Sequence, residues 1–342
     1  MRRRHLGLPT AIMAGALALF ISAGPALACG GLIGPNGAVN LLRTTTFVGY
    51  HAGIEHYVTA FAFAGGGGKF GSIIPLPGIP SNVERGGDWT LQRLIRETQP
   101  VQESADFLFA APAAGRVEVL LEKRIDALDI TVLKGGGDDV GAWAKDHGFR
   151  LPPDAPEVLD FYAERSPIFL AASFDADAAA ARGQAIGDGT PIHITIPTPN
   201  PWVPLRILGL GKNAADRIEA DVYLLTDAVP AFLPAPTGRG MNLAHSARAS
   251  DPLLDDLRSD KGMDWIPAAG WLSQIRLDAG PTELSYDLAV DASGQGTPSR
   301  VAAGLARPAS SNEPLVPAGP FLLLLGSYLA GAVIFVARLA KS

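Results

Sequence analysis

The stretch TTTFVGYHAGIEHYVTAFAF, residues 44–63, decides how this chain folds. Thr44 to Tyr50 and Glu55 to Phe63 are rich in β-branched and aromatic side chains, which fit the pleated surface of a sheet. Ala52-Gly53 stands between the two runs, and glycine adopts the backbone angles of a tight turn without strain. The stretch therefore predicts a β-hairpin, so that sheet rather than helix organises this region.

Alternation of apolar and polar residues extends the prediction along the chain. Ile192, Ile194 and Ile196 point to one face of an expected strand, and His193 and Thr195 point to the other. The same pattern recurs at residues 117–121, 218–224 and 284–290. Period two with one polar face indicates half-buried strands, mostly antiparallel.

Helical patterns are confined to short segments at residues 91–98, 140–147, 154–162 and 253–257, the last of them the weakest. Asp88 is a candidate N-cap for the first, and Gly148 ends the second. Asp154 and Glu157 have the spacing of a capping box at the start of the third. The predicted fold class is α+β: a strand-rich, mostly antiparallel domain with three or four short helices, plus one C-terminal transmembrane helix.

The N-terminal segment has the pattern of a secretory signal peptide, residues 1–28. Arg2-Arg3-Arg4 supplies the cationic start, residues 11–21 a short apolar stretch, and Ala26-Leu27-Ala28 the small residues of a cleavage site. The apolar stretch is too short to span a membrane comfortably. Cleavage there would make Cys29 the first mature residue, which leaves a lipoprotein as the alternative to ordinary cleavage.

The other end predicts a membrane anchor. No charged residue occurs from Leu315 to Ala337, and a helix over residues 320–337 would be about 27 Å long, close to the thickness of the hydrocarbon core. Arg338 and Lys341 follow at once, so the positive-inside rule places residues 338–342 in the cytoplasm. The expected organisation is therefore an extracytoplasmic α+β domain at 29–290, a flexible Pro/Ser/Gly stalk at 291–319, the span and the tail.

Composition narrows the class of function. The chain has 342 residues, a single cysteine and a formal net charge of −6. The cysteine count excludes a disulfide framework within the chain and any multi-cysteine metal site. The acidic balance argues against nucleic acid as the main partner. The expected partners are the membrane and an envelope protein or polymer, and the oligomeric state is left open.

The histidines are the candidates for chemistry. His51 and His56 are one residue too far apart for a helical zinc motif, although on a hairpin His51 could face Glu55 or His56. A two-ligand metal site with a carboxylate is one interpretation, and polar hairpin residues are the plainer one. His193 is expected on the polar side of a strand and His245 in a loop.

The remaining polar patterns predict no chemistry. His147 is expected at a helix C-terminus, and Asp251, Asp255, Asp256 and Asp260 on the solvated face of a short helix. The chain contains neither G-x-S-x-G nor S-x-x-K. The sequence therefore assigns no catalytic, cofactor-binding or metal-binding residue and no cofactor.

Several stretches together resemble a bacterial secreted family, domain of unknown function 2330. They are Cys29-Gly30-Gly31, residues 36–40, the hairpin at 49–64, residues 71–78, residues 142–149, Leu151-Pro152-Pro153 and residues 201–207. The likeness covers most of residues 29–290. It implies an exported or membrane-tethered protein with no assigned activity and no catalytic residues to transfer.

The leading hypothesis is a membrane-tethered extracytoplasmic protein that acts as a non-enzymatic binding or scaffolding module. The alternative is an envelope hydrolase, and a third hypothesis is a redox or lipid-linked role for Cys29. One structural observation discriminates between the first two. A cleft that gathers two or more of the histidines beside carboxylates favours the enzyme, and scattered, solvated imidazoles favour the binding module.

Overall fold

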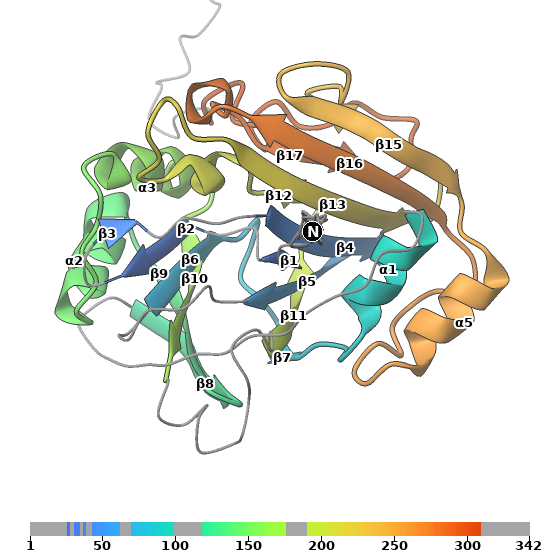
Figure 1. The fold of residues 1–342 in the computed structure, drawn as a ribbon, viewed down its shortest axis with the longest axis horizontal. Coiled ribbons are helices and arrows are strands. Elements are labelled where there is room, and N and C mark those ends of the chain that lie inside the picture. The colour runs from blue at the N-terminus through green and yellow to red at the C-terminus, as the bar shows by residue number, and fades with distance from the viewer. Residues whose placement is uncertain are drawn as a thin grey trace, which may run out of the picture. The chain divides into compact units, whose positions relative to one another are not determined.

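The computed structural model describes residues 26–27, 31–34, 37–38, 43–61, 70–98, 118–175 and 190–308. The chain divides into two units, residues 1–306 and 307–342, and every helix and strand described lies in the first (Figure 1). Nearly all of the predicted signal peptide, and the whole predicted span at 320–337, lie outside the described residues. Within those residues, no helix is both long and apolar enough to cross a membrane.

Sheet A is the largest of three sheets, with the strand order β15-β16-β13-β4-β5-β11-β7 and β1 paired to β4. Its strands are β1 (Ala26–Leu27), β4 (Arg43–His51), β5 (Ile54–Phe61), β7 (Asn82–Arg85), β11 (Thr190–Pro197), β13 (Ile218–Thr226), β15 (Met241–Arg248) and β16 (Trp271–Ala279). Only the pairs of β4 with β13 and with β1 are parallel. The sheet is therefore mostly antiparallel, as the alternation pattern predicts.

Sheets B and C contain the other strands. Sheet B has the order β3-β2-β6-β10-β9-β8, and its strands are β2 (Gly31–Gly34), β3 (Gly37–Ala38), β6 (Phe70–Pro75), β8 (Glu118–Ile125), β9 (Leu128–Lys134) and β10 (Ile168–Phe174). Sheet C has the order β12-β17-β14, with β12 (Trp202–Val203), β14 (Ala231–Leu233) and β17 (Leu288–Asp291). Two 3-10 turns, Arg206–Gly209 and Pro281–Glu283, lie in the connections.

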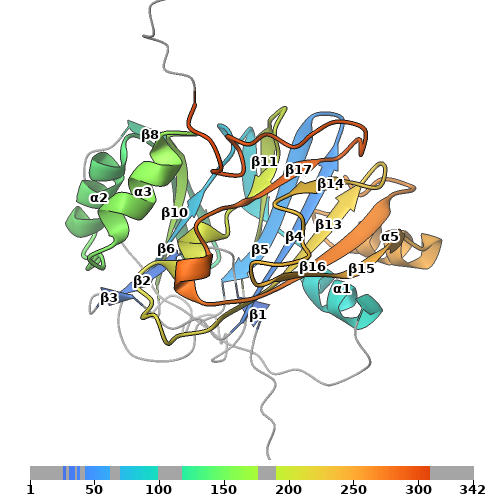
Figure 2. The same cartoon turned by 90° about the horizontal axis from the view of Figure 1, so that it is seen from above.

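Among the described residues, four α-helices cover the outer faces of sheets A and B (Figure 2): α1 (Thr90–Thr98), α2 (Gly137–Asp146), α3 (Ala155–Ala163) and α5 (Asp251–Ser259). Leu94 of α1 and Leu254 of α5 pack with Phe47 and Val58 on one face of sheet A. On sheet B, α2 and α3 pack with residues such as Phe169. The four helices and the mixed order of strands confirm the α+β class.

The central core lies between sheets A and B. Val48 and Tyr57 of sheet A share an apolar cluster with Ile130 and Leu170 of sheet B. Their neighbours Phe47 and Val58 point to the opposite face, towards α1 and α5. Because successive side chains alternate between faces, the middle strands of sheet A are apolar on both sides, and a polar residue there needs a partner.

The hairpin is confirmed by β4 and β5. Ala52 and Gly53 have φ angles of 51° and 81°, the left-handed pair of a two-residue hairpin turn. The helix predicted at 253–257 is also confirmed, and Ser250 caps it by accepting a hydrogen bond from the Leu253 amide. The strand predicted at 284–290 is shorter, since β17 begins at Leu288.

Two predicted helix caps are wrong because more distant groups compete for them. At α1 the side chain of Asp260, which is 5% exposed, accepts hydrogen bonds from the backbone amides of Asp88 and Trp89. The Asp88 side chain pairs with Arg85 instead of capping the helix. Asp260 is thus a buried cap rather than part of a solvated helix face. At α3, Asp154 makes no side-chain cap and instead accepts from the Gly211 amide at 2.9 Å.

The folded unit continues into the segment predicted as a stalk. Ala302 and Ala303 are buried, and the Ala303 carbonyl accepts a hydrogen bond from the amide of Asp287. The first unit accordingly extends to Ala306.

Candidate functional site

The candidate site lies on the face of sheet A that α1 and α5 cover elsewhere. There β11 runs between β5 and β7 and pairs with both. Thr195 of β11 stands opposite His56 of β5, and His193 stands opposite Glu84 of β7. Residues paired across neighbouring strands share one face of a sheet. The fold therefore brings His56, His193 and Glu84 together, and these residues with Trp265 are called the His56–His193 site.

The two imidazoles are joined by a hydrogen bond. His56 Nδ1 lies 2.9 Å from His193 Nε2, while the ring centres are 5.1 Å apart with 24° between the planes. Because the ring centres are far apart while the two nitrogens are in close contact, the rings meet edge to edge and do not lie over each other. The two nitrogens therefore face each other with one proton between them.

Glu84 favours one position for that proton. Glu84 Oε1 lies 3.3 Å from His193 Nδ1, close enough for electrostatic attraction, but the contact is not aligned as a hydrogen bond. Within the part of the chain that the structure describes, Nδ1 has no hydrogen-bond partner. A carboxylate can only accept, so it favours the tautomer with a proton on His193 Nδ1. His193 Nε2 then accepts the proton of His56 Nδ1, and Nε2 of the half-buried His56 carries no proton.

A tryptophan covers the histidine pair. The Trp265 indole stacks on the His56 ring with centres 4.0 Å apart and 4° between planes. It can lie flat because β4 presents Gly49 opposite His56, where a Cβ would overlap the indole ring. Trp265 Nε1 is buried and, like His193 Nδ1, has no hydrogen-bond partner within the described part of the chain. Buried polar atoms without partners are uncommon in folded proteins.

Burial lowers the pKa of both imidazoles to about 4. It is the larger cause for each ring, and the charge that His193 would carry lowers the pKa of His56 further. Asp264 acts in the opposite direction at both rings and does not offset the burial. Both imidazoles are therefore neutral near pH 7, the form in which a ring nitrogen can bind a metal ion.

A second ionisable group is buried on the opposite face of β5. Glu55 is fully buried; its Oε2 accepts a hydrogen bond from the Trp202 amide at 3.2 Å, and its Oε1 has no partner among the residues that the structure describes. Burial raises the pKa of Glu55 to about 8, because the bond from Trp202 offsets only part of the cost of burying the charge. Glu55 is therefore mainly protonated at pH 7.

Another buried cluster is fully paired, and Asp287 is its centre. Asp287 Oδ1 accepts from the Tyr162 hydroxyl at 2.8 Å and from the amides of Leu205 and Arg206 at 2.7 and 3.0 Å. Asp287 Oδ2 accepts from Arg165 Nη2 at 2.5 Å. Neither the carboxylate nor the guanidinium is more than 4% exposed. This Asp287 cluster ties α3 to the connections around sheet C.

The other histidines lie elsewhere. His51 stands opposite Ile54, so the prediction that it faces Glu55 or His56 is wrong; it pairs with the exposed Asp227 at 2.7 Å. His147 is buried at the end of α2, where Nδ1 lies 2.6 Å from the Trp143 carbonyl. His245 belongs to β15 and not to a loop.

The sequence pattern predicted neither the burial of His193 nor the parts played by Glu84 and Trp265. His193 is only 2% exposed although it occupies a polar position of an alternating strand. One feature indicates this burial: β11, which contains His193, has a neighbouring strand on each side, β5 and β7, and is not an edge strand. No local pattern identifies Trp265, which follows α5 and reaches β5 only through the fold.

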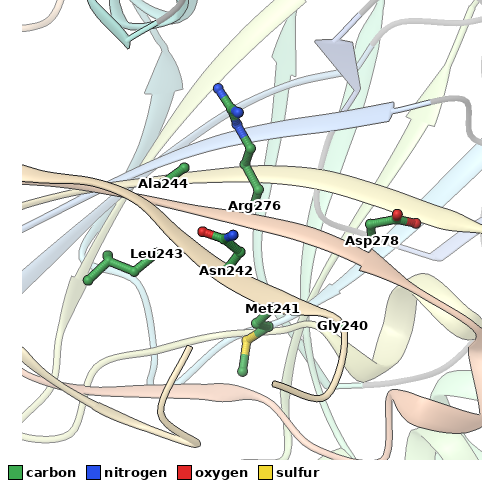
Figure 3. Close-up of a pocket in the computed structure, with 7 residues that line it drawn as sticks. All are labelled: Gly240, Met241, Asn242, Leu243, Ala244, Arg276 and Asp278. Atoms are coloured by element: carbon green, nitrogen blue, oxygen red, sulfur yellow. The ribbon is translucent and has the colours of Figure 1, made fainter. Parts of the chain in front are cut away.

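A separate hollow of about 630 Å³ lies at the edge of sheet A. Figure 3 shows the side chains that line it. It is lined by Gly240, Met241, Asn242, Leu243 and Ala244 of β15 and the turn before it, and by Arg276 and Asp278 of β16. In the strand order, β15 is separated from β5 by β16, β13 and β4. The hollow is therefore distinct from the His56–His193 site. Across the described residues, no group of three or more His, Cys, Asp or Glu side chains is placed to hold a metal ion.

The fold defines an α+β protein in which two mostly antiparallel sheets pack face to face between pairs of helices. The chain belongs to the family DUF2330, described as an uncharacterized protein conserved in bacteria, whose pattern matches residues 23–230. This match confirms the resemblance found in the sequence.

No curated protein matches the chain. Among solved structures, the 3.1 Å crystal structure of a mutated baculovirus P35 after caspase cleavage has a TM-score of 0.34 and 8% identity, over 74% of this chain and 93% of that one. The crystal structure of baculovirus P35 has a TM-score of 0.32 and 11% identity, over 60% and 76%. Similarity this low supports no conclusion about function.

Proposed function

We propose that this protein is a single-pass membrane protein of the cell envelope whose folded unit lies outside the cytoplasm and acts as a binding or scaffolding module. The observation that carries the proposal is the charge-free run from Leu315 to Ala337, closed by Arg338 and Lys341. Its Leu, Ile, Phe and Val residues each favour insertion by about 0.3 to 0.6 kcal/mol at the centre of a span. The two cations that follow favour a cytoplasmic C-terminus.

The N-terminal pattern supports the same topology. Arg2-Arg3-Arg4 and the Ala26-Leu27-Ala28 site are those of a segment that directs export and is then removed. The predicted signal peptide (residues 1–28) and the predicted span and tail (residues 320–342) together contain five of the 28 basic residues and none of the 34 acidic ones. The folded unit is therefore more acidic than the whole chain and is not attracted to anionic lipid head groups.

Two reporters test this topology in one chain. Alkaline phosphatase, active only after export, is inserted after Pro308, and a green fluorescent protein, fluorescent only in the cytoplasm, follows Ser342. The proposal predicts that both reporters work. Replacing Leu323 and Leu324 by lysine, at a cost of about 2.5 to 3.5 kcal/mol each at the span centre, should release the protein from the membrane. An inactive phosphatase in the unmodified chain would contradict the proposal.

The hollow beside β15 is a candidate surface for a partner. Its volume of about 630 Å³ lies within the range of small-ligand sites, and Arg276 and Asp278 offer both signs of charge at its wall. A photo-crosslinking residue at Asn242 should capture an envelope component from intact cells. The same residue at the exposed Lys123 of β8 is the matched control, and equal capture at both positions would argue against binding at the hollow.

An envelope hydrolase is the second candidate, and one observation favours it: two neutral imidazoles lie beside the carboxylate of Glu84. In this function His56 Nε2, which carries no proton, would act as the general base, and His193 and Glu84 would orient it. His56→Gln should then abolish hydrolysis of envelope polymers while His245→Gln leaves it unchanged. Equal activity of the two variants would exclude this role for His56.

A further inference from the structure

We infer that His56 Nδ1 and His193 Nε2 form a binding site for a divalent transition-metal cation of the Zn²⁺ type. The inference depends on neither candidate function, since it concerns only side chains within the folded unit. Two observations support it: the spacing of the two nitrogens and the carboxylate behind His193.

The spacing is close to that of a metal site. Zn²⁺ binds imidazole nitrogen at about 2.0 to 2.1 Å, so two tetrahedral ligands lie roughly 3.3 Å apart. The two nitrogens are now 2.9 Å apart across a shared proton. A widening of a few tenths of an ångström, with a turn of the half-buried His56 ring, would let both nitrogens face one ion.

Binding of the cation requires only that one proton move within the His56 ring, and it needs no other reactant. In the tautomer that Glu84 favours, His56 carries its proton on Nδ1. When the cation binds there, that proton moves to His56 Nε2, and the cation forms bonds to His56 Nδ1 and His193 Nε2. Both imidazoles remain neutral, and no proton is released from the pair.

Glu84 supplies the second observation. A histidine that ligates a metal commonly presents its other ring nitrogen to a carboxylate, which fixes the tautomer and the ring orientation. Glu84 Oε1 is 3.3 Å from Nδ1 of His193, while Nε2 of the same ring faces His56. A small rotation of the Glu84 side chain, which is 42% exposed, would align that contact as a hydrogen bond.

The chemistry of the two ligands selects the cation. The imidazoles are nitrogen ligands, which suit Zn²⁺ or Cu²⁺ and not Mg²⁺ or Ca²⁺. The described residues supply no third His, Cys, Asp or Glu, so the cation would keep positions open to water or a ligand, with Thr195 Oγ1 3.5 Å from His193 Nε2.

Isothermal titration of the full chain in detergent with zinc chloride tests the inference, with magnesium chloride as the contrasting cation. We expect one zinc ion per chain and no saturable heat with magnesium. Binding should weaken at least tenfold in His56→Gln and in His193→Gln and remain unchanged in His245→Gln. Glu84→Gln should weaken it by 10- to 100-fold, as for other outer partners of metal ligands.

Two results with zinc would overturn the inference: no saturable binding by the unmodified chain, or binding of equal strength in His56→Gln. His193 is buried and its replacement can disturb folding, whereas His56 is half-buried, so the His56 variant decides the outcome. Circular dichroism of each variant establishes that it is folded before titration. Equal binding of magnesium would also overturn the inference, because it would indicate oxygen ligands.

Discussion

The Asp287 cluster and the His56–His193 site are both buried in the folded unit, yet they differ in how completely their hydrogen bonds are made. Asp287 has a partner for each carboxylate oxygen, including a buried guanidinium. In the described ranges, the His56–His193 site leaves His193 Nδ1 and Trp265 Nε1 without hydrogen-bond partners, and Glu55 Oε1 on the other face of β5 lacks one as well. A fully paired network holds elements together, whereas His56 Nδ1 and His193 Nε2 are hydrogen-bonded to each other and can both turn to a cation.

The largest expected effect is at the satisfied cluster. Asp287→Asn leaves the buried Arg165 without its counter-charge, and breaking such a pair costs about 3 to 5 kcal/mol of unfolding free energy. Urea unfolding of the full chain measures the change. Asp255→Asn, which alters an exposed pair with Arg258, is the matched control and should shift stability by less than about 1 kcal/mol. Similar midpoints for the two variants would mean that the Asp287 cluster does not stabilise the fold.

The unsatisfied carboxyl predicts a dependence on pH. The pKa of Glu55 is raised to about 8, so the folded state keeps a proton that the unfolded state loses at lower pH, and stability falls as pH rises towards 8. The pKa of each imidazole, His56 and His193, is lowered to about 4, so their contribution rises with pH until about 6.5.

Stability should therefore be greatest near pH 6.5 and fall by about 1 kcal/mol by pH 8. Glu55→Gln removes the titrating group, and its urea midpoint should not fall over that interval. A fall of the same size in the variant would assign the pH dependence to another group.

A smaller effect is expected where Trp265 lies across β4. In Gly49→Ala the new methyl group overlaps the indole, and overpacking of this kind costs about 1 to 3 kcal/mol. Tryptophan fluorescence and thermal unfolding should both change. Gly209→Ala is the control, because the nearest atom to its Cβ is 3.7 Å away, and it should leave both signals unchanged. Unaltered fluorescence in Gly49→Ala would contradict the stacked arrangement.

The smallest effect is expected at the wall of the hollow. Arg217 and Asp278 form a pair whose side chains are 57% and 64% exposed, and such pairs contribute about 0 to 1 kcal/mol. Arg217→Ala should therefore leave thermal unfolding nearly unchanged, and any remaining difference should disappear in high salt. A loss of several kcal/mol would show that the exposed pair is structurally important.

Local patterns predicted the local structure well. The Ala52-Gly53 turn, the alternating strand at 192–196 and the end of α2 at Gly148 all depend on residues close together in sequence, and the structure has each of them. The two wrong caps, at Asp88 and Asp154, also have a physical reason. A local carboxylate has the right spacing, but Asp260 or Gly211 provides a partner that only the fold brings near.

The candidate site could not be predicted in this way. His56 and His193 are separated by 137 residues, and their contact depends on the register of β5 with β11. Period two predicts which face His193 points to, but not that Trp265 covers that face. Burial, which sets the pKa of both imidazoles, is therefore a property of the assembled sheet and not of the hairpin sequence.

The most direct test of the claim that the unsatisfied site is a binding site is thermal unfolding of the full chain with and without zinc chloride. A ligand at about 100 times its dissociation constant stabilises the folded state by about 2.7 kcal/mol. The account predicts a higher Tm with zinc for the unmodified chain and for His245→Gln, reversed by a chelator, and no shift for His56→Gln. An equal shift in all three proteins, or none in any, would contradict it.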